Sequence, residues 1–166
     1  MRSGEEIIAA LNLEPLPGEG GYFRETWRSG VPGQSPVGSS VEDRSAGTAI
    51  YYLVTEASFS VLHRLPIDEV WHFYLGDPVE QLRLDAEEGS GLVVLGPSIG
   101  QGQEFQSVVR AGVWQGTRLQ EGGSFALMGT TMAPGFDFRD YESGESSVLA
   151  AQFPEWTMEI SRFVRS

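Results

Sequence analysis

The sequence contains no cysteine and no lysine, and it has only two histidines, His63 and His72. Without cysteine there is no thiolate nucleophile, and without lysine there is neither a Schiff-base amine nor a lysine-containing phosphate loop. Any imidazole base or imidazole metal ligand must therefore be His63 or His72. One copy of the chain cannot supply a three-histidine metal site.

The chain is also poor in positive charge and in long apolar runs. Its 23 acidic residues outnumber its 11 basic ones, which gives a formal net charge of −12 at pH 7. Such a surface repels nucleic acids and anionic membranes, so we expect neither as a partner. The most apolar run, residues 49–54, is too short to span a bilayer, and the acidic start is unlike a secretory signal. The sequence predicts a soluble cytoplasmic protein, and the lack of cysteine fits a reducing compartment.

Turn residues divide most of the chain into short segments of alternating hydrophobicity. At 166 residues, the chain is expected to form a single domain over residues 1–166. A capping-box pattern at residues 3–6 predicts a short N-terminal helix, and Pro154 can open a short C-terminal helix. Strands are predicted at 22–28, 48–55, 59–65, 70–75, 80–85, 91–95, 104–109, 113–119, 124–130 and 148–153, with a loop at 29–47. This spacing is typical of a mainly β sandwich or barrel, here covering about residues 20–153.

The spacing around Glu69 resembles the first cupin motif, in which a His-x-His is followed by a Glu and then, six residues later, by a Gly. His63, Glu69 and Gly76 occupy the corresponding positions. The second motif, Pro-x-Gly-x-x-His, is echoed by residues 110–115. This chain departs from the pattern at Leu65 and Gln115, which stand where the second and the last histidine would be, and an arginine replaces the proline.

Most of the chain is similar to one group of small single-domain cupins, a domain of unknown function within the RmlC-like jelly-roll superfamily. The similar segments are 19–26, 48–53, 60–64, 68–74, 112–116 and 133–138. The resemblance implies an all-β double-stranded β-helix, or jelly-roll barrel, usually dimeric and with a ligand-sized cavity. It supplies no reaction. Relatives tend to carry a His-Pro where this chain has Leu16-Pro17.

Side-chain alternation along the predicted strands selects the candidate site residues. A barrel interior takes every second residue of a strand. His63 and Glu69 are the candidate catalytic residues, and the cupin register joins their two strands. The candidate ligand-binding residues that share the cavity are Arg24, Trp71, Phe73 and Gln115. His72 falls on the opposite strand face from Glu69, so we expect it outside the cavity, in a structural or interface role. A satisfied core histidine is the alternative role for His63.

Four functions are compatible with this set of residues. The first is a cupin that binds a small molecule of unknown identity, with a sugar or a nucleotide-sugar as the candidate class. The second is a metal-independent sugar isomerase or epimerase, as in the metal-free epimerases of the superfamily, with His63 as the base, Glu69 or Asp68 orienting it, and Tyr22, Tyr51 or Tyr52 as the acid. The third is a metal-dependent enzyme with His63, Glu69 and Gln115 as ligands, and the fourth is a structural homodimer. The sequence leaves open whether the protein is an enzyme.

No cofactor is expected, and a divalent metal is expected to bind weakly or not at all. His63, Glu69 and Gln115 would form an incomplete cage, because one neutral amide replaces a stronger donor. The expected partners are a small-molecule ligand and a second copy of the chain, since a barrel of this kind leaves exposed sheet edges.

Overall fold

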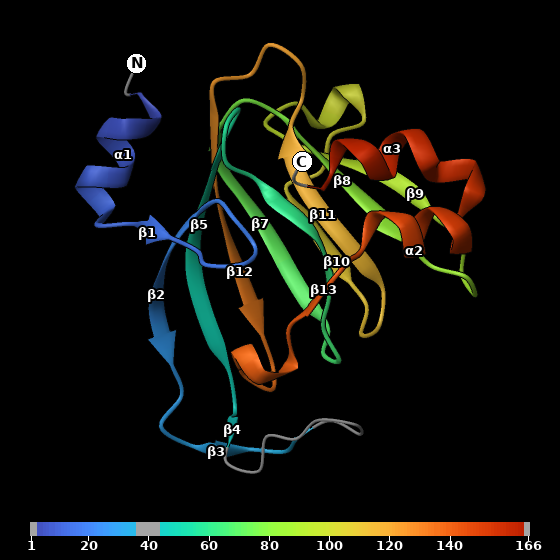
Figure 1. Cartoon of the computed structure of the whole chain (residues 1–166). Helices are drawn as coiled ribbons and strands as arrows, with labels where there is room; N and C mark the ends of the chain where they lie inside the picture. Colours follow the sequence, from blue (N-terminus) through green and yellow to red (C-terminus); the bar gives the residue numbers. More distant parts are fainter. Residues whose placement is uncertain (1–2, 36–43, 165–166) are drawn as a thin grey trace.

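The protein folds into two antiparallel sheets that face each other, as the computed structural model in Figure 1 shows. The structure describes residues 3–35 and 44–164. One sheet has the strand order β1-β2-β5-β12-β7-β10 and the other has β13-β6-β11-β8-β9. The strands of the first sheet are β1 (Glu14–Pro15), β2 (Tyr22–Arg28), β5 (Thr48–Thr55), β12 (Phe125–Met132), β7 (Glu69–Gly76) and β10 (Gln106–Val109). Those of the second are β13 (Glu142–Ser143), β6 (Ser60–Arg64), β11 (Trp114–Leu119), β8 (Val79–Leu84) and β9 (Gly91–Leu95).

The chain repeatedly crosses from one sheet to the other between β5 and β13, which is the path of a jelly-roll barrel. The predicted fold class is therefore confirmed. A small ribbon of β3 (Pro32–Gly33) and β4 (Arg44–Ser45) lies within the predicted loop at 29–47, of which residues 36–43 are outside the described residues. A single 3-10 turn, η1 (Ile99–Gln101), precedes β10.

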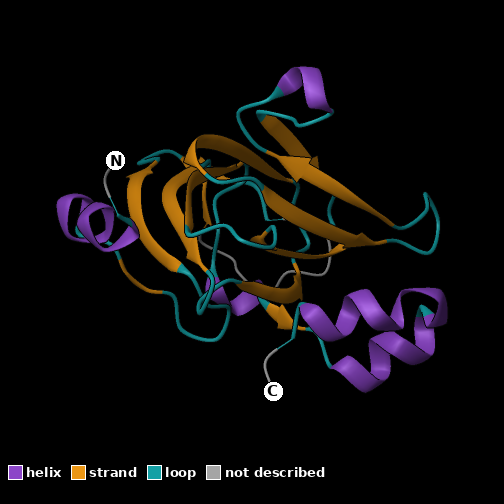
Figure 2. Ribbon diagram, turned by 90° about the horizontal axis from the view of Figure 1, so that it is seen from above, coloured by secondary structure: helices purple, strands orange, loops and turns teal. Residues whose placement is uncertain are grey.

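Helices cover the outer faces of the two sheets, on opposite sides of the barrel (Figure 2). Helix α1 (Gly4–Leu11) begins at Ser3 with the predicted capping box, and its Ile7 packs with Leu53 and Leu127 of the six-stranded sheet. Helices α2 (Ser146–Gln152) and α3 (Thr157–Arg162), joined by the 3-10 turn η3 (Pro154–Trp156), cover the five-stranded sheet. Within the described residues, no helix is long and apolar enough to cross a membrane.

The strand predicted at 148–153 is wrong, because these residues belong to helix α2 and the turn that follows it. Leu149 and Phe153 are four residues apart and are buried together against Leu62, while Val148 is exposed. Apolar residues at i and i+4 suit one helix face, and the intervening alanines favour helix. The last strand therefore ends at Ser143, ahead of the predicted end of the barrel at 153.

Pro154 opens the final helical segment, as predicted: it is the first residue of the turn η3, which leads into α3. Ile160 and Phe163 are fully buried in the cluster with Leu62, Leu82 and Leu84. The backbone of Phe163 also accepts a hydrogen bond from the backbone N–H of Leu62. Residues 160–163 are thus part of the packed fold.

We expect Phe163→Ala to lower the free energy of unfolding by about 3–5 kcal/mol, because it opens a cavity under a fully buried ring. Met158→Ala, at a position of the same helix that is 78% exposed, is the control and should change stability by less than about 0.5 kcal/mol. Urea denaturation of both variants measures the difference. Equal effects would show that the C-terminal helices do not belong to the cooperative core.

Candidate functional site

A cavity of about 290 Å³ lies against the inner face of the six-stranded sheet. Most of its wall is apolar and aromatic, and its polar lining is mainly acidic. The apolar lining residues are Leu16, Phe23, Ile50, Tyr52, Leu65, Trp71, Met132, Phe136 and Phe138, counting Tyr52 by its ring. The polar ones are Glu19, Glu25, Arg28, Thr48, Glu69, Thr130 and Asp137.

Strand register explains why these residues meet. Residues that pair across neighbouring strands have their side chains on the same face of a sheet. One row across the sheet, from β2 to β10, is Arg28, Thr48, Met132, Glu69 and Val109. The next row is Glu25, Ile50, Thr130, Trp71 and Ser107. Apart from the two β10 members, both rows line the cavity.

A β-bulge in β2 changes which of its residues face inward. The pairing with β5 shifts between Glu25 and Trp27, so Glu25 and Arg28 both point into the cavity. The placement predicted for Arg24 is wrong: it pairs with Tyr51 on the outer face, and its guanidinium lies 5.6 Å from the centre of that ring. Strict alternation would put Arg24 and Arg28 on one face of β2. The bulge separates them, so that Arg28 joins Phe23 and Glu25 on the inner face while Arg24 stays on the outer one.

Gln115 connects the two sheets at the inner end of the cavity. Its Nε2 donates a hydrogen bond to Oε2 of Glu69 at 2.8 Å, and its Oε1 accepts one from Nε1 of Trp71 at 2.9 Å. Gln115 belongs to β11 of the five-stranded sheet, whereas Glu69 and Trp71 belong to β7. All three side chains are buried. Both ends of the amide are therefore used to hold Glu69 and Trp71 in place.

Glu19 supplies a second buried carboxylate, from the turn that precedes β2. It is 7% exposed, Glu69 is 6% exposed, and Oε1 of Glu19 accepts a hydrogen bond from the Ser60 hydroxyl at 2.7 Å. The Tyr52 hydroxyl donates to the carbonyl of Gly20 at 2.7 Å, which ties the turn to β5. Gly21 has a φ of +69°, and a Cβ there would lie 2.5 Å from the Tyr52 ring, so only glycine fits this close approach.

The environment of Glu69 favours its neutral form. Burial raises the pKa of Glu69, and the nearby charge of Glu19 raises it further, while His63 and the hydrogen bonds from Thr130 and Gln115 act in the opposite direction. Burial also raises the pKa of Tyr52 well above its usual value, with Glu19 as the next contribution. Two buried carboxyl groups thus share one aromatic-lined cavity, where each disfavours the charged form of its neighbour.

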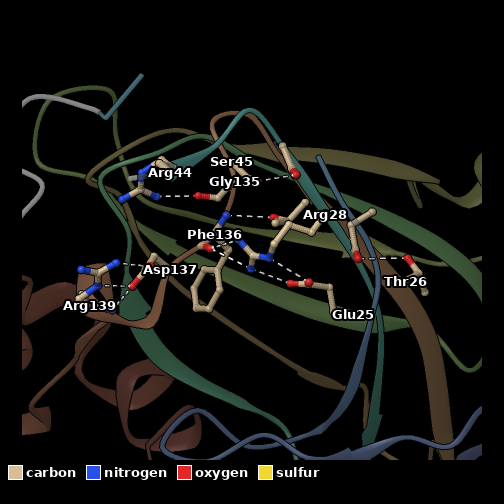
Figure 3. A network of polar contacts seen from close by, with 12 residues as sticks. Glu25, Thr26, Arg28, Arg44, Ser45, Gly135, Phe136, Asp137 and Arg139 are labelled. Atoms are coloured by element: carbon tan, nitrogen blue, oxygen red, sulfur yellow. Dashed lines mark hydrogen bonds and ion pairs between the residues drawn. The ribbon is translucent and has the colours of Figure 1, made fainter. Parts of the chain in front are cut away.

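The lining residues that follow β12 are Phe136, Asp137 and Phe138; they are partly exposed, and we call them the mouth of the cavity. This segment runs into the 3-10 turn η2 (Phe138–Asp140), and Figure 3 shows the polar contacts that hold it. Arg28 donates to the carbonyl of Phe136 at 3.3 Å while it pairs with Glu25 at 2.7 Å. Arg44 donates to the carbonyl of Gly135 at 2.6 Å and pairs with Asp140. These contacts anchor the mouth segment to β2 and β4.

Of the six candidate residues that sequence predicted in one cavity, Glu69 and Trp71 line it. Gln115 does not line the cavity, but its side chain hydrogen-bonds to both of them. Phe73 belongs to the same core cluster as Trp71 and is likewise not part of the lining. His63 pairs with Gln115 in the register of β6 and β11, so it faces the interior, but it is 1% exposed and does not line the cavity.

The two histidines have different surroundings. His63 Nδ1 lies 2.8 Å from the carbonyl of Val61, which can only accept, so Nδ1 carries the proton; its ring stacks on Tyr141 at 5.2 Å. His72 lies on the outer face of β7, where Gln106 Nε2 donates to its Nδ1 and its Nε2 contacts the Thr131 hydroxyl, both at 3.0 Å. Burial lowers the pKa of His72. His72 is thus placed away from the cavity.

The donor atoms do not fit a tightly held transition metal. The only Gln115 atom able to ligate a metal, Oε1, already accepts from Trp71, and one nitrogen of His63 is engaged with its own strand. Among residues 3–35 and 44–164, no group of three His, Asp or Glu side chains is arranged to hold a metal ion. The absence of a tightly bound metal remains a prediction.

Several lining residues were not predicted as site residues, above all Glu19, Arg28, Thr130 and the aromatic residues of the mouth. Glu19 lies in a turn, where alternation says nothing about direction. Its one sequence signal is an isolated carboxylate between glycines, at the start of the similar segment 19–26. Arg28 reaches the inner face of β2 only because of the bulge. Thr130 is an ordinary strand residue, and its place in the cavity follows only from its pairing with Ile50 and Trp71.

A jelly-roll barrel with a cavity against the inner face of one sheet, and a His–Glu–Gln set at cupin-motif positions, defines the class of this protein as a cupin. Residues 5–144 match the family model described as "Cupin superfamily (DUF985)". The chain belongs to this family. No curated protein matches it.

Two solved structures are similar over essentially the whole chain. A hypothetical protein from Leishmania major is 29% identical, with a TM-score of 0.90 over 99% of this chain and 100% of that one. A protein from Shewanella oneidensis is 28% identical, with a TM-score of 0.87 over 99% of each chain. Oxalate decarboxylase from Bacillus subtilis is 16% identical with a TM-score of 0.53, and the match covers 93% of this chain but 38% of that one. This last likeness shows the fold alone.

We expect Glu69→Gln to stabilise the protein more at pH 8 than at pH 4. Because the folded pKa of Glu69 is raised, the folded state binds its proton more tightly than the unfolded state does. The contribution of Glu69 to the free energy of unfolding is therefore fully present below the pKa of the unfolded state, and it is lost as the pH rises through the pKa of the folded state. The loss is about 1.4 kcal/mol for each pH unit between the two values.

Urea denaturation over a range of pH measures the free energy of unfolding of both proteins. Glu121→Gln, on an exposed turn, is the control. Identical pH profiles for Glu69→Gln and wild type would contradict the expectation.

The wild-type protein, purified without chelator, is expected to contain far less than one transition metal per chain. As a positive control, the double variant Leu65→His/Gln115→His restores the two imidazoles that this chain lacks at motif positions, and it should retain zinc or manganese after dialysis. Elemental analysis by mass spectrometry gives both values. A full equivalent of metal in wild type, resistant to mild chelation, would overturn the expectation.

Proposed function

We propose that the protein binds a small molecule in the cavity against the six-stranded sheet. The observation that carries the proposal is the combination of aromatic walls with two buried carboxylates in one cavity of about 290 Å³. Small-molecule sites are concave, mostly apolar and furnished with a few fixed polar groups. Glu69 is fixed by Gln115 and Glu19 by Ser60, so the polar groups are in place before a ligand arrives.

A sugar fits this lining better than a nucleotide-sugar does. Carboxylate oxygens and the Thr130 hydroxyl can accept hydrogen bonds from sugar hydroxyls, and Trp71 offers an aromatic surface beside them. A diphosphate would enter a cavity lined by four acidic residues and one arginine, and that arginine is already paired with Glu25. The lining therefore supports the sugar itself, or another ligand rich in donors, over an anionic conjugate.

Proton transfer on the bound molecule is the second candidate function, and the carboxylate pair favours it. Two carboxyl groups with unequal environments can act as acid and base at the same pH. Glu69, whose pKa is raised, is the candidate acid, and Glu19 is the candidate base. In the isomerase-like mechanism predicted from sequence, His63 was the base. Because His63 does not line the cavity, we no longer propose it as the base; it acts on Glu69 through its charge, which lowers the pKa of that carboxyl group.

A homodimer also remains a proposal. The outer face of the six-stranded sheet beyond α1 carries partly exposed apolar side chains, including Tyr74, Leu75 and Val108. Strand β10 forms an edge of this sheet. Exposed edges and apolar patches are commonly covered by association with another copy.

We expect Ile50→Trp to abolish ligand binding by filling the cavity from β5. Val108→Trp, on the exposed face of β10, is the matched control and should bind as wild type does. Each protein is incubated with the fraction of a cell extract below 1 kDa and recovered by ultrafiltration, and retained compounds are identified by mass spectrometry. Wild type and Val108→Trp should retain a compound that Ile50→Trp does not. Failure of wild type to retain any compound, or equal retention by Ile50→Trp, would contradict the proposal.

A further inference from the structure

Two carboxyl groups lie at the inner end of the cavity without an arginine beside them. Glu19 and Glu69 are both more than nine-tenths buried, and neither forms an ion pair with an arginine among the described residues. Their hydrogen-bond donors are neutral: the Ser60 hydroxyl for Glu19, and the Gln115 amide and the Thr130 side chain for Glu69. His63 acts on Glu69 through its charge, but it does not line the cavity. Each carboxylate can accept several more hydrogen bonds.

The acidic residues at the mouth are balanced differently. Glu25 is paired with Arg28 at 2.7 Å, and Asp137 with Arg139 at 2.8 Å, which holds the pKa of Asp137 at about 2. Both of these pairs are partly exposed, so water also screens their charge. The carboxyl groups without a guanidinium partner are therefore those at the buried end of the cavity, where a cation from a ligand would be the missing counter-ion.

Aromatic rings form the wall around the same cavity. Tyr52 and Trp71 meet edge to face at 5.5 Å, and Phe23 joins them from β2, while Phe136 and Phe138 close the mouth. The faces of aromatic rings attract cations, and the attraction is stronger where water is excluded. Two buried carboxylates in an aromatic enclosure thus combine the two features that select a positive ligand.

Resting on the proposed small-molecule function, we infer that the cavity selects ligands with an ammonium group, which lies between Glu19 and Glu69 while the apolar part packs against the aromatic wall. An amino sugar or an aryl-alkyl amine belongs to this class, so the inference narrows the proposed sugars to those that carry an amino group; a neutral sugar and a carboxylate should bind more weakly. An ammonium group brings three donors and one positive charge, and both match what the carboxylates lack.

Three probes of equal shape test the charge: 2-phenylethylammonium, 2-phenylethanol and phenylacetate. Calorimetric titration at pH 7 should show that the ammonium probe binds wild type at least tenfold more tightly than the alcohol, with phenylacetate weakest. Glu19→Gln and Glu69→Gln should each reduce the preference for the ammonium probe over the alcohol by about tenfold. Glu121→Gln, outside the cavity, should keep the wild-type preference.

The outcomes separate this inference from the proposed function. If the alcohol or phenylacetate binds wild type as tightly as the ammonium probe and Ile50→Trp removes that binding, the cavity binds small molecules but the preference for a cation is overturned. If none of the probes binds wild type, the ammonium inference fails, and the extract experiment decides the proposed function by itself. Should the glutamine variants fail to fold, the comparison of the three probes on wild type still decides the inference.

Discussion

The site depends on one amide group. Gln115 reaches from the five-stranded sheet to the six-stranded sheet, donates to Glu69 and accepts from Trp71. An amide has a donor end and an acceptor end, so the two contacts also determine which way round it lies. Removal of Gln115 would leave the buried indole N–H of Trp71 without its acceptor and would leave Glu69 with the hydrogen bond from Thr130 but not the one from Gln115. This costs more than the loss of an ordinary surface contact. The same amide therefore links the two sheets and fixes the orientation of the Glu69 side chain.

This arrangement gives a chemical meaning to the departures from the cupin motifs. Where the motif would provide two more imidazoles, Leu65 contributes apolar wall and Gln115 contributes a hydrogen-bond bridge. The carboxylate at the motif position, Glu69, is retained, and Glu19 approaches it from a turn outside either motif. The cupin fold is thus kept, while the polar groups at its centre include a Glu69–Gln115 hydrogen bond and a second carboxyl group from Glu19.

Much of the fold was predictable because short amphipathic strands and glycine turns leave a clear pattern. Strands β5 and β9 and the start of the last helical segment agree with the predicted bounds. Helix α2 was mistaken for a strand because its apolar residues are few and its length is short, so the two periodicities were hard to separate. Glu69 and Trp71 were found by alternation. Arg24 was placed in the cavity because the wrong face of β2 was chosen: the inward face carries Phe23 and Glu25, and only Arg28 is moved to it by the bulge. Glu19 was missed because a turn has no periodicity. His63 was predicted to line the cavity, but a side chain that faces the interior need not contact the cavity.

The contacts that hold the mouth of the cavity have a consequence for how the family can diversify. Arg28, Arg44 and the Thr48 hydroxyl bond to main-chain atoms of Gly135 and Phe136. Main-chain atoms are present whatever side chain stands at a position. Substitutions at 136 and 138 can therefore reshape the entrance without releasing the segment from the barrel. The attachment of this segment and the lining that it contributes to the cavity therefore depend on different atoms.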